Sequence, residues 1–179
     1  MSWIKEYSPE EKPRLKSIYE RTEARTKEKV ANVLKVHSID PDALERHIAL
    51  YEHLMFADGP LSRREREMIG VVVSSANECP YCVKHHGDSF AHVTDRAELA
   101  EVLSVDYDNA DISKRERAIC DYAMKLSETP YKITEEDIER LRKEGLDDLA
   151  IFHVNQIAAY FNYVNRVVHG LGVNLESQG

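Results

Sequence analysis

Long stretches without a helix-breaking residue restrict the fold of this chain more than any other feature. The 179 residues include only seven glycines and six prolines. Most of the stretches between them have apolar residues at helical rather than alternating spacing, and no pattern of strands alternating with helices is evident. The chain is long enough to bury a core without disulfides or metals. We therefore predict an all-α fold in a single domain.

Two local patterns mark where helices begin. One is a serine or threonine followed three residues later by an acidic residue, which forms a capping box; the other is a proline at the first helical position. The starts marked in these ways are Pro41, Ser62, Pro80, Ser113 and Thr134. The helix after Ser62 becomes apolar on every side over Ile69, Val71, Val72 and Val73, which predicts a buried helix. A last long helix is expected from about Asp147 to Val168, with Gly170 as its C-terminal glycine.

Two of these predicted helix starts resemble each other. Residues 62–66 read Ser-Arg-Arg-Glu-Arg, and residues 113–117 read Ser-Lys-Arg-Glu-Arg. Either both are simply good helix starts, or a helical unit was duplicated and only the first copy kept its cysteines. The offset between the copies places Pro130 and Ile133 at the positions of Cys79 and Cys82.

Charge and hydropathy exclude several classes of protein. The formal net charge of -8 argues against nucleic-acid binding, which requires a basic patch. The N-terminus lacks the apolar core of a secretory signal, and the longest apolar run, residues 69–73, is far too short to span a bilayer. We expect a cytoplasmic protein with no membrane or nucleic-acid partner. In that compartment, cysteines favour thiol chemistry or metal ligation over structural disulfides.

Four residues form the candidate site. Cys79, Cys82 and His86 stand at spacings that place them on one face of a helix, and the N-terminus of that helix favours a thiolate at Cys82. Glu67 lies roughly 15 Å before the turn, and His86 roughly 10 Å after it, at about 1.5 Å per helical residue. If the two helices pack as a hairpin, Glu67 comes close to His86 and orients the imidazole.

The order Glu67, Cys79, Cys82, His86 resembles the signature of the alkylhydroperoxidase D-like family of the carboxymuconolactone decarboxylase superfamily. Residues 61–67, 75–82 and 161–166 also resemble the branch known as peroxidase-related enzymes. The similarity covers most of the chain from about Val30 to Val173. It implies a single helical domain over residues 30–179, preceded by a helical extension over residues 1–29, with a helical hairpin that carries the site.

The resemblance also implies a thiol peroxidase with a division of roles. Cys82 would attack hydrogen peroxide or an organic hydroperoxide, and Cys79 would form a disulfide with it. His86 would deprotonate Cys82, and Glu67 would pass the proton on. An external dithiol, from a lipoyl-type or thioredoxin-like protein, would reduce the disulfide. The family also implies a homo-oligomer and calls for no cofactor or metal.

One position departs from the family pattern. The founding type has a histidine directly before the second cysteine, where this chain has Tyr81. A phenol titrates near pH 10 and cannot replace histidine as a proton carrier at neutral pH. His85 is the nearby candidate for that role. The departure bears on both the peroxidase rate and the identity of the reductant.

Two alternatives to the peroxidase stay open. The same pair could serve a thiol-disulfide oxidoreductase or redox sensor with little peroxide turnover. Alternatively, Cys79, Cys82 and His86 could hold zinc in a structural oligomer, although a closed site needs a fourth ligand. Cys120 lies in an apolar helical stretch, where a buried core position is the more common role of a free cysteine.

Overall fold

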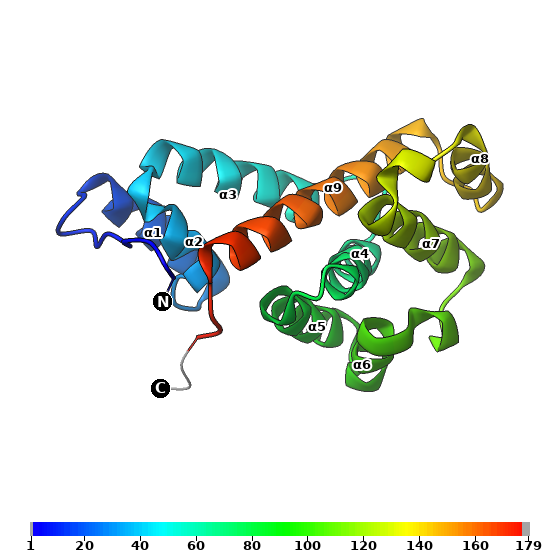
Figure 1. Cartoon of the computed structure of the whole chain (residues 1–179), viewed down its shortest axis with the longest axis horizontal. Helices are drawn as coiled ribbons and strands as arrows, with labels where there is room; N and C mark the ends of the chain where they lie inside the picture. The colour runs from blue at the N-terminus through cyan, green and yellow to red at the C-terminus, as the bar shows by residue number, and fades with distance from the viewer. Residues whose placement is uncertain (1, 177–179) are drawn as a thin grey trace. The chain divides into compact units, whose positions relative to one another are not determined.

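The computed structural model describes residues 2–176, and all regular structure among them is helical (Figure 1). The predicted all-α class is confirmed. Nothing among these helices is long and apolar enough to cross a membrane. The elements are α1 (Arg14–Thr26), α2 (Asn32–Lys35), the 3-10 turn η1 (Val36–Ile39), α3 (Pro41–Phe56), α4 (Arg63–Ala76), α5 (Pro80–Thr94), α6 (Ala97–Asp106), η2 (Tyr107–Asn109), α7 (Lys114–Glu128), η3 (Pro130–Lys132), α8 (Glu135–Lys143) and α9 (Asp148–Leu171).

The predicted helix starts are confirmed by their hydrogen bonds. Ser62 Oγ accepts from the backbone N–H of Glu65, and the Glu65 carboxylate accepts from the backbone N–H of Ser62 at 2.7 Å. Ser113 forms the same reciprocal box at the start of α7. Pro80 is the first residue of α5, with Cys79 as its N-cap residue. Local chemistry therefore sets where the helices of the site begin.

Two features of the helix pattern differ from prediction. The last helix does not end at Gly170: α9 continues to Leu171, and the residue with left-handed φ is Gly172, at 63°. A Cβ on Gly172 would lie 2.2 Å from the Trp3 ring, so only glycine fits there. Helix α6 was not predicted, because it follows Arg96, which makes no side-chain cap hydrogen bond, and neither start pattern marks it.

The described residues fall into two compact units. The first includes the residues up to His53 together with those from Arg166 onward, and the second is Leu54–Asn165. Leu15, Ile18, Leu44 and Ile48 form an apolar cluster in the first unit. The boundary predicted after residue 29 stays a prediction.

The second unit is built around α4, which packs against α5, α6 and α7 (Figure 1). Every residue of α4 from Glu65 to Ser74 is buried: the apolar pattern predicts this for residues 69–73, and the charged residues Glu65, Arg66 and Glu67 are buried as well. An apolar cluster between these helices consists of Met68, Val71, Val72, Phe90, Leu99, Ala100, Leu103, Ala110 and Cys120. This core holds α4 rigidly. The backbone positions from which α4 side chains reach the site are therefore fixed.

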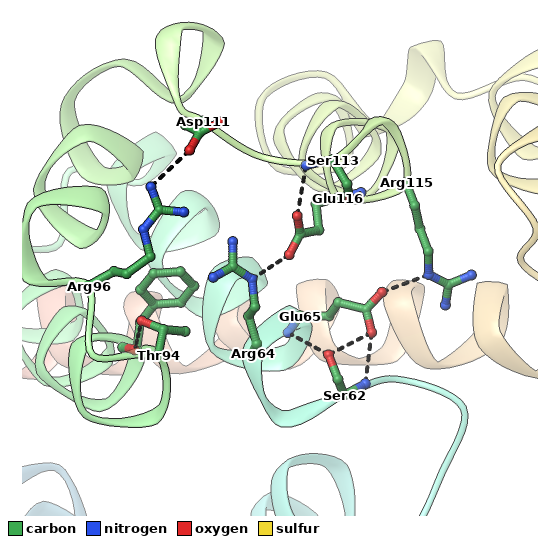
Figure 2. A network of polar contacts seen from close by, with 10 residues as sticks. Ser62, Arg64, Glu65, Thr94, Arg96, Asp111, Ser113, Arg115 and Glu116 are labelled. Atoms are coloured by element: carbon green, nitrogen blue, oxygen red, sulfur yellow. Dashed lines mark hydrogen bonds and ion pairs between the residues drawn. The ribbon is translucent and has the colours of Figure 1, made fainter.

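The starts of α4 and α7 are joined by two reciprocal ion pairs (Figure 2). Arg64 donates to Glu116, and Arg115 donates to Glu65 at 2.7 Å. Each glutamate is also the capping-box residue of its own helix. Burial alone would raise the pKa of Glu116, but the hydrogen bonds from Arg64 and Ser113 outweigh it and hold that pKa below its usual range.

Candidate active site

The short connection between α4 and α5 brings the two cysteines to the head of a helix. Helix α4 ends at Ala76, and the backbone N–H groups of Asn77 and Cys79 donate back to its last carbonyls at 3.1 and 2.9 Å. Glu78 between them has a left-handed φ of 50°, which turns the chain sharply. Cys79 is thus the N-cap residue of α5, and Cys82 lies in its first turn.

Both sulfurs are buried and unbridged. Cys79 has none of its surface exposed and Cys82 only 2%. The Cys82 thiol is hydrogen-bonded to Cys79, and this contact, followed by burial, raises the pKa of Cys82. The sequence-based expectation of a lowered pKa at Cys82 is therefore wrong. A negative charge on either sulfur of a buried pair makes the other thiol harder to ionise.

The structure brings Glu67 and His86 together. Glu67 Oε2 lies 2.7 Å from His86 Nδ1. Glu67 is fully buried on α4, and His86 is nearly buried on α5, one turn beyond Cys82. A carboxylate at this position binds the Nδ1–H tautomer, which leaves Nε2 as the nitrogen that can accept a proton.

Arg63 is part of the site although the sequence analysis did not name it. It donates to the second oxygen of Glu67, and it donates to the carbonyl of Met55 at 2.7 Å. Its guanidinium also lies over the Phe56 ring, 3.8 Å from the centroid. The signal in the sequence was the spacing of four residues from Arg63 to Glu67 on one helix. Two partners from different helices thus hold the Glu67 carboxylate.

The His86 ring is confined from two further sides. The Phe161 ring meets it edge-on, with the centroids 4.4 Å apart. Gly70 on α4 lies beneath both rings: a Cβ there would be 3.1 Å from His86 Cγ and 3.1 Å from Phe161. The absence of a side chain at Gly70 therefore lets the imidazole approach α4 closely enough to reach Glu67.

One buried amide near Cys82 comes from α9. Asn165 is fully buried and is hydrogen-bonded to Cys82. Its oxygen accepts from Asn77 Nδ2 at 3.0 Å, and its nitrogen donates to Ser74 Oγ at 3.2 Å. The residues that Asn165 contacts lie about ninety positions earlier in the chain, at the end of α4 and just after it.

A family model matches nearly the whole chain. The model described as PA26 p53-induced protein (sestrin) matches residues 3–179. This chain belongs to the sestrin family. Sestrin-3 of Mus musculus is 25% identical over 154 residues, which are 84% of this chain and 30% of that protein. The chain thus spans about three tenths of the length of this relative.

Solved structures relate this sestrin-family chain to peroxidase-related proteins. An uncharacterized one from Silicibacter sp. TM1040 is 32% identical, with a TM-score of 0.87, and the match covers 93% of this chain and 86% of that one. An alkylhydroperoxidase core protein from Ralstonia eutropha JMP134 is 29% identical, with a TM-score of 0.91, over 99% and 93% of the two chains. The predicted single helical domain of the alkylhydroperoxidase D-like type is confirmed.

For a further neighbour of this sestrin-family chain, the likeness shows the fold alone. The debrominase Bmp8, solved in complex with 2,3,4-tribromopyrrole, is 16% identical, with a TM-score of 0.83 over 99% of this chain and 95% of that one.

In this sestrin-family chain, Tyr81 and His85 pair with each other. Their rings lie 4.5 Å apart and are tilted by 43°, and Tyr81 is buried. Cys120 lies in the apolar core of the second unit, as predicted, and burial raises the pKa of its thiol.

The zinc alternative has no support in the described part of this chain. Among residues 2–176, no group of three or more histidine, cysteine, aspartate or glutamate side chains is arranged to hold a metal ion. Glu67 and His86 are instead engaged with each other, and the Cys82 thiol with Cys79 and Asn165.

Proposed function

We propose that this chain is a thiol peroxidase that reduces hydrogen peroxide or an organic hydroperoxide through a cycle between a Cys79–Cys82 dithiol and its disulfide. The observation that carries the proposal is the His86–Glu67 hydrogen bond of 2.7 Å, one turn beyond Cys82. A buried base with a fixed tautomer, one helical turn beyond the second of two buried thiols, suits thiol oxidation. The alkylhydroperoxidase D-like neighbours support the same chemistry.

The first step is removal of the proton from Cys82. Because Glu67 holds Nδ1–H, the Nε2 atom of His86 is free to take the thiol proton, and Glu67 stabilises the imidazolium that forms. The raised pKa of Cys82 means that the resting thiol is neutral. The thiolate therefore forms only as the proton moves to His86.

The Cys82 thiolate then attacks the peroxide. An S–O bond forms and the O–O bond breaks, so Cys82 becomes a sulfenic acid, and the leaving alkoxide or hydroxide takes the proton from His86. The Cys79 thiol gives up its proton and attacks the sulfenic sulfur. Water leaves, and the Cys79–Cys82 disulfide forms. An external dithiol, lipoyl-type or thioredoxin-like, restores both thiols and is itself oxidised to a disulfide.

The proposal also covers the cellular compartment and the oligomeric state of the enzyme. Reduction by an external dithiol suits a reducing compartment such as the cytoplasm. We also propose a homo-oligomer. Phe152 and Tyr163 support it, because both are about half exposed on α9, although most apolar side chains of that helix are buried.

A thiol-disulfide oxidoreductase or redox sensor is the second candidate. Tyr81 in place of the family histidine favours it, since a phenol adds no proton carrier at neutral pH for the attack on peroxide.

The test measures peroxide consumption by the full chain with an excess of a small dithiol. Cys82→Ser should abolish consumption, whereas Cys79→Ser should leave a sulfenic acid at Cys82 that dimedone traps. Cys120→Ser is the matched control and should keep wild-type turnover. Turnover in the Cys82→Ser variant would refute the proposed peroxidase. Rapid disulfide exchange without peroxide consumption by the wild type would favour the oxidoreductase.

A further inference from the structure

The contact between Glu67 and His86 is compatible with two positions of one proton. The separation of 2.7 Å between Glu67 Oε2 and His86 Nδ1 fits an ionised carboxylate that accepts from Nδ1–H. It equally fits a neutral carboxyl group that donates its O–H to a bare Nδ1. In the first arrangement Nε2 is free to accept a proton, whereas in the second Nε2 already carries the ring hydrogen. The charge of Glu67 therefore decides whether His86 has a free Nε2.

Burial works against the charge of Glu67. Its side chain has no exposed surface. A carboxylate that is removed from water without a positive partner normally binds a proton and becomes neutral. An imidazolium at His86 would supply a positive charge, but its Nε2 would then already be protonated. A free Nε2 therefore requires a cation at Glu67 other than His86.

Arg63 supplies that cation. Its Nη2 donates to Glu67 Oε1, while the other carboxylate oxygen faces His86. Both residues lie on α4, where side chains four positions apart share a face. A guanidinium group stays protonated at every pH at which proteins are folded. The carboxylate thus has a permanent positive charge on one oxygen and the imidazole on the other.

The end of α3 holds the Arg63 guanidinium in place. Arg63 Nη1 donates to the Met55 carbonyl at 2.7 Å, and the guanidinium carbon lies 3.8 Å from the centroid of the Phe56 ring. Both contacts come from the last turn of α3, which ends at Phe56. Carbonyls in a last turn have no partner within their own helix and bind cations well. The positive charge beside Glu67 is therefore fixed before any reaction begins.

A second arginine of α4 is engaged elsewhere. Arg66 donates to the carbonyls of Leu61 at 2.9 Å, Leu54 at 3.1 Å and Ala57 at 2.8 Å. Of these two arginines, Arg63 is the one that is hydrogen-bonded to Glu67.

We propose that Arg63 is a positioning residue, which keeps Glu67 ionised and thereby sets the Nδ1–H tautomer of His86. The effect on catalysis rests on the proposed peroxidase function, in which Nε2 accepts the proton of Cys82. The effect on the tautomer does not rest on it, because it depends only on the charge of Glu67. The two are therefore measured separately.

The first experiment observes the ring nitrogens of His86 by NMR in the full, reduced chain with isotope-labelled histidine. It is done at about pH 7.5, above the ordinary imidazole pKa of about 6.5, and the spectrum of His86→Gln identifies the His86 signals. The wild type should show a protonated Nδ1 and a bare Nε2. In Arg63→Met, which removes the charge, the proton should move to Nε2. A wild-type pattern in Arg63→Met, or a protonated Nε2 in the wild type, would overturn the proposal.

Arg63→Lys separates the charge from the link between helices. Lysine keeps a positive charge within reach of Glu67, but its single ammonium group lacks the planar fork that binds Glu67 and Met55 together. The wild-type tautomer should therefore return in Arg63→Lys. If Arg63 only tied α3 to α4, lysine would fail as methionine does, and that result would overturn the role of the charge.

Arg64→Met is the matched control. Arg64 is the next residue of α4, its side chain is 27% exposed like that of Arg63, and it donates to Glu116 instead (Figure 2). This variant should keep the wild-type tautomer of His86. A moved proton in Arg64→Met would show that any lost ion pair of α4 has the same effect, and would refute the assignment.

Arg63→Gln keeps the proposal testable if Arg63→Met does not fold. Its amide keeps a hydrogen-bond donor but has no charge. The proton should again lie on Nε2, and a bare Nε2 in Arg63→Gln would overturn the role of the charge.

Peroxide consumption by the same proteins separates this proposal from the proposed function. Arg63→Met should consume peroxide at least about tenfold more slowly than the wild type, since a positioned base supplies roughly 10²–10⁴-fold, and Arg63→Lys should recover most of the rate. If the wild type consumes no peroxide but the tautomer changes as expected, the peroxidase fails and the role of Arg63 stands. If the wild type consumes peroxide and Arg63→Met matches it in both measurements, the role of Arg63 fails alone.

Discussion

At Cys82, three effects compete over the ionisation of one thiol. The hydrogen bond with Cys79 and the burial of the pair raise its pKa, and Asn165 lowers it; the sum is a raised pKa. A thiol of this kind is protected from stray oxidants while it rests, because the thiolate is the nucleophile. In the proposed mechanism its reactivity depends on His86, one helical turn further along α5, rather than on a standing negative charge.

A prediction at this scale concerns Cys79. In Cys79→Ala the largest cause of the raised pKa is removed, so thiolate formation at Cys82 should begin at lower pH than in the wild type. Ultraviolet thiolate absorbance during a pH titration of the reduced protein measures it, with Cys120→Ala as the matched buried-cysteine control. A Cys82 titration that stays in place or moves to higher pH would contradict the explanation.

At the scale of helices, α4 links the capping box of Ser62 to the carboxylate of Glu67. Ser62→Ala removes the hydroxyl that accepts from the Glu65 N–H and should lower the free energy of unfolding by about 1 kcal/mol. Urea unfolding of the purified chain measures this. Loss of the cap should also fray the first turn of α4. Because Glu67 lies just after that turn, peroxide consumption should fall as well.

Ser113→Ala is the matched variant, since Ser113 makes the same box at the start of α7. It should cost a similar free energy of unfolding but leave peroxide consumption near the wild-type rate, because α7 contributes neither thiol nor base. Equal losses of activity in the two variants would contradict this explanation, because the loss would then not depend on which helix frays.

For the stability of the whole chain, a stacked histidine pair, of which His47 is buried and His37 is partly buried, predicts acid sensitivity. The rings of His37 and His47 stack with centroids 4.5 Å apart. Burial, with a smaller contribution from His37, lowers the pKa of His47 from 6.5 to about 4, and burial also lowers the pKa of His37. Both groups are therefore neutral in the folded chain at pH values where the unfolded chain begins to take up protons.

The folded pKa of His47 lies below the unfolded value, so its contribution to stability is present above about pH 6.5 and is lost as the pH falls toward about 4. The loss should approach roughly 3 kcal/mol, at about 1.4 kcal/mol per pH unit. Urea unfolding at several pH values measures this slope, which His47→Gln should reduce. The exposed His92, changed to glutamine, is the control. A wild-type slope in His47→Gln would exclude the pair as the cause.

Sequence alone predicted much of the fold and the geometric basis of the site. The starts of α4, α5 and α7 follow from residues three positions apart or from a single proline, so they depend on local chemistry only. The approach of Glu67 to His86 followed from the rise of two helices and a short turn. Helix α6 was missed because no capping residue marks its start.

Only the tertiary structure decided how Cys82 ionises and which groups surround it. Asn165 reaches Ser74 and Asn77 from α9, and no periodicity along a chain relates residues so far apart. The direction in which the pKa of Cys82 is shifted depends on a neighbouring thiol and on burial, and neither can be predicted from the spacing of residues in the sequence. Covalent spacing determines which side chains a helix presents, whereas the dielectric and the hydrogen-bond partners of a buried group arise only when helices pack.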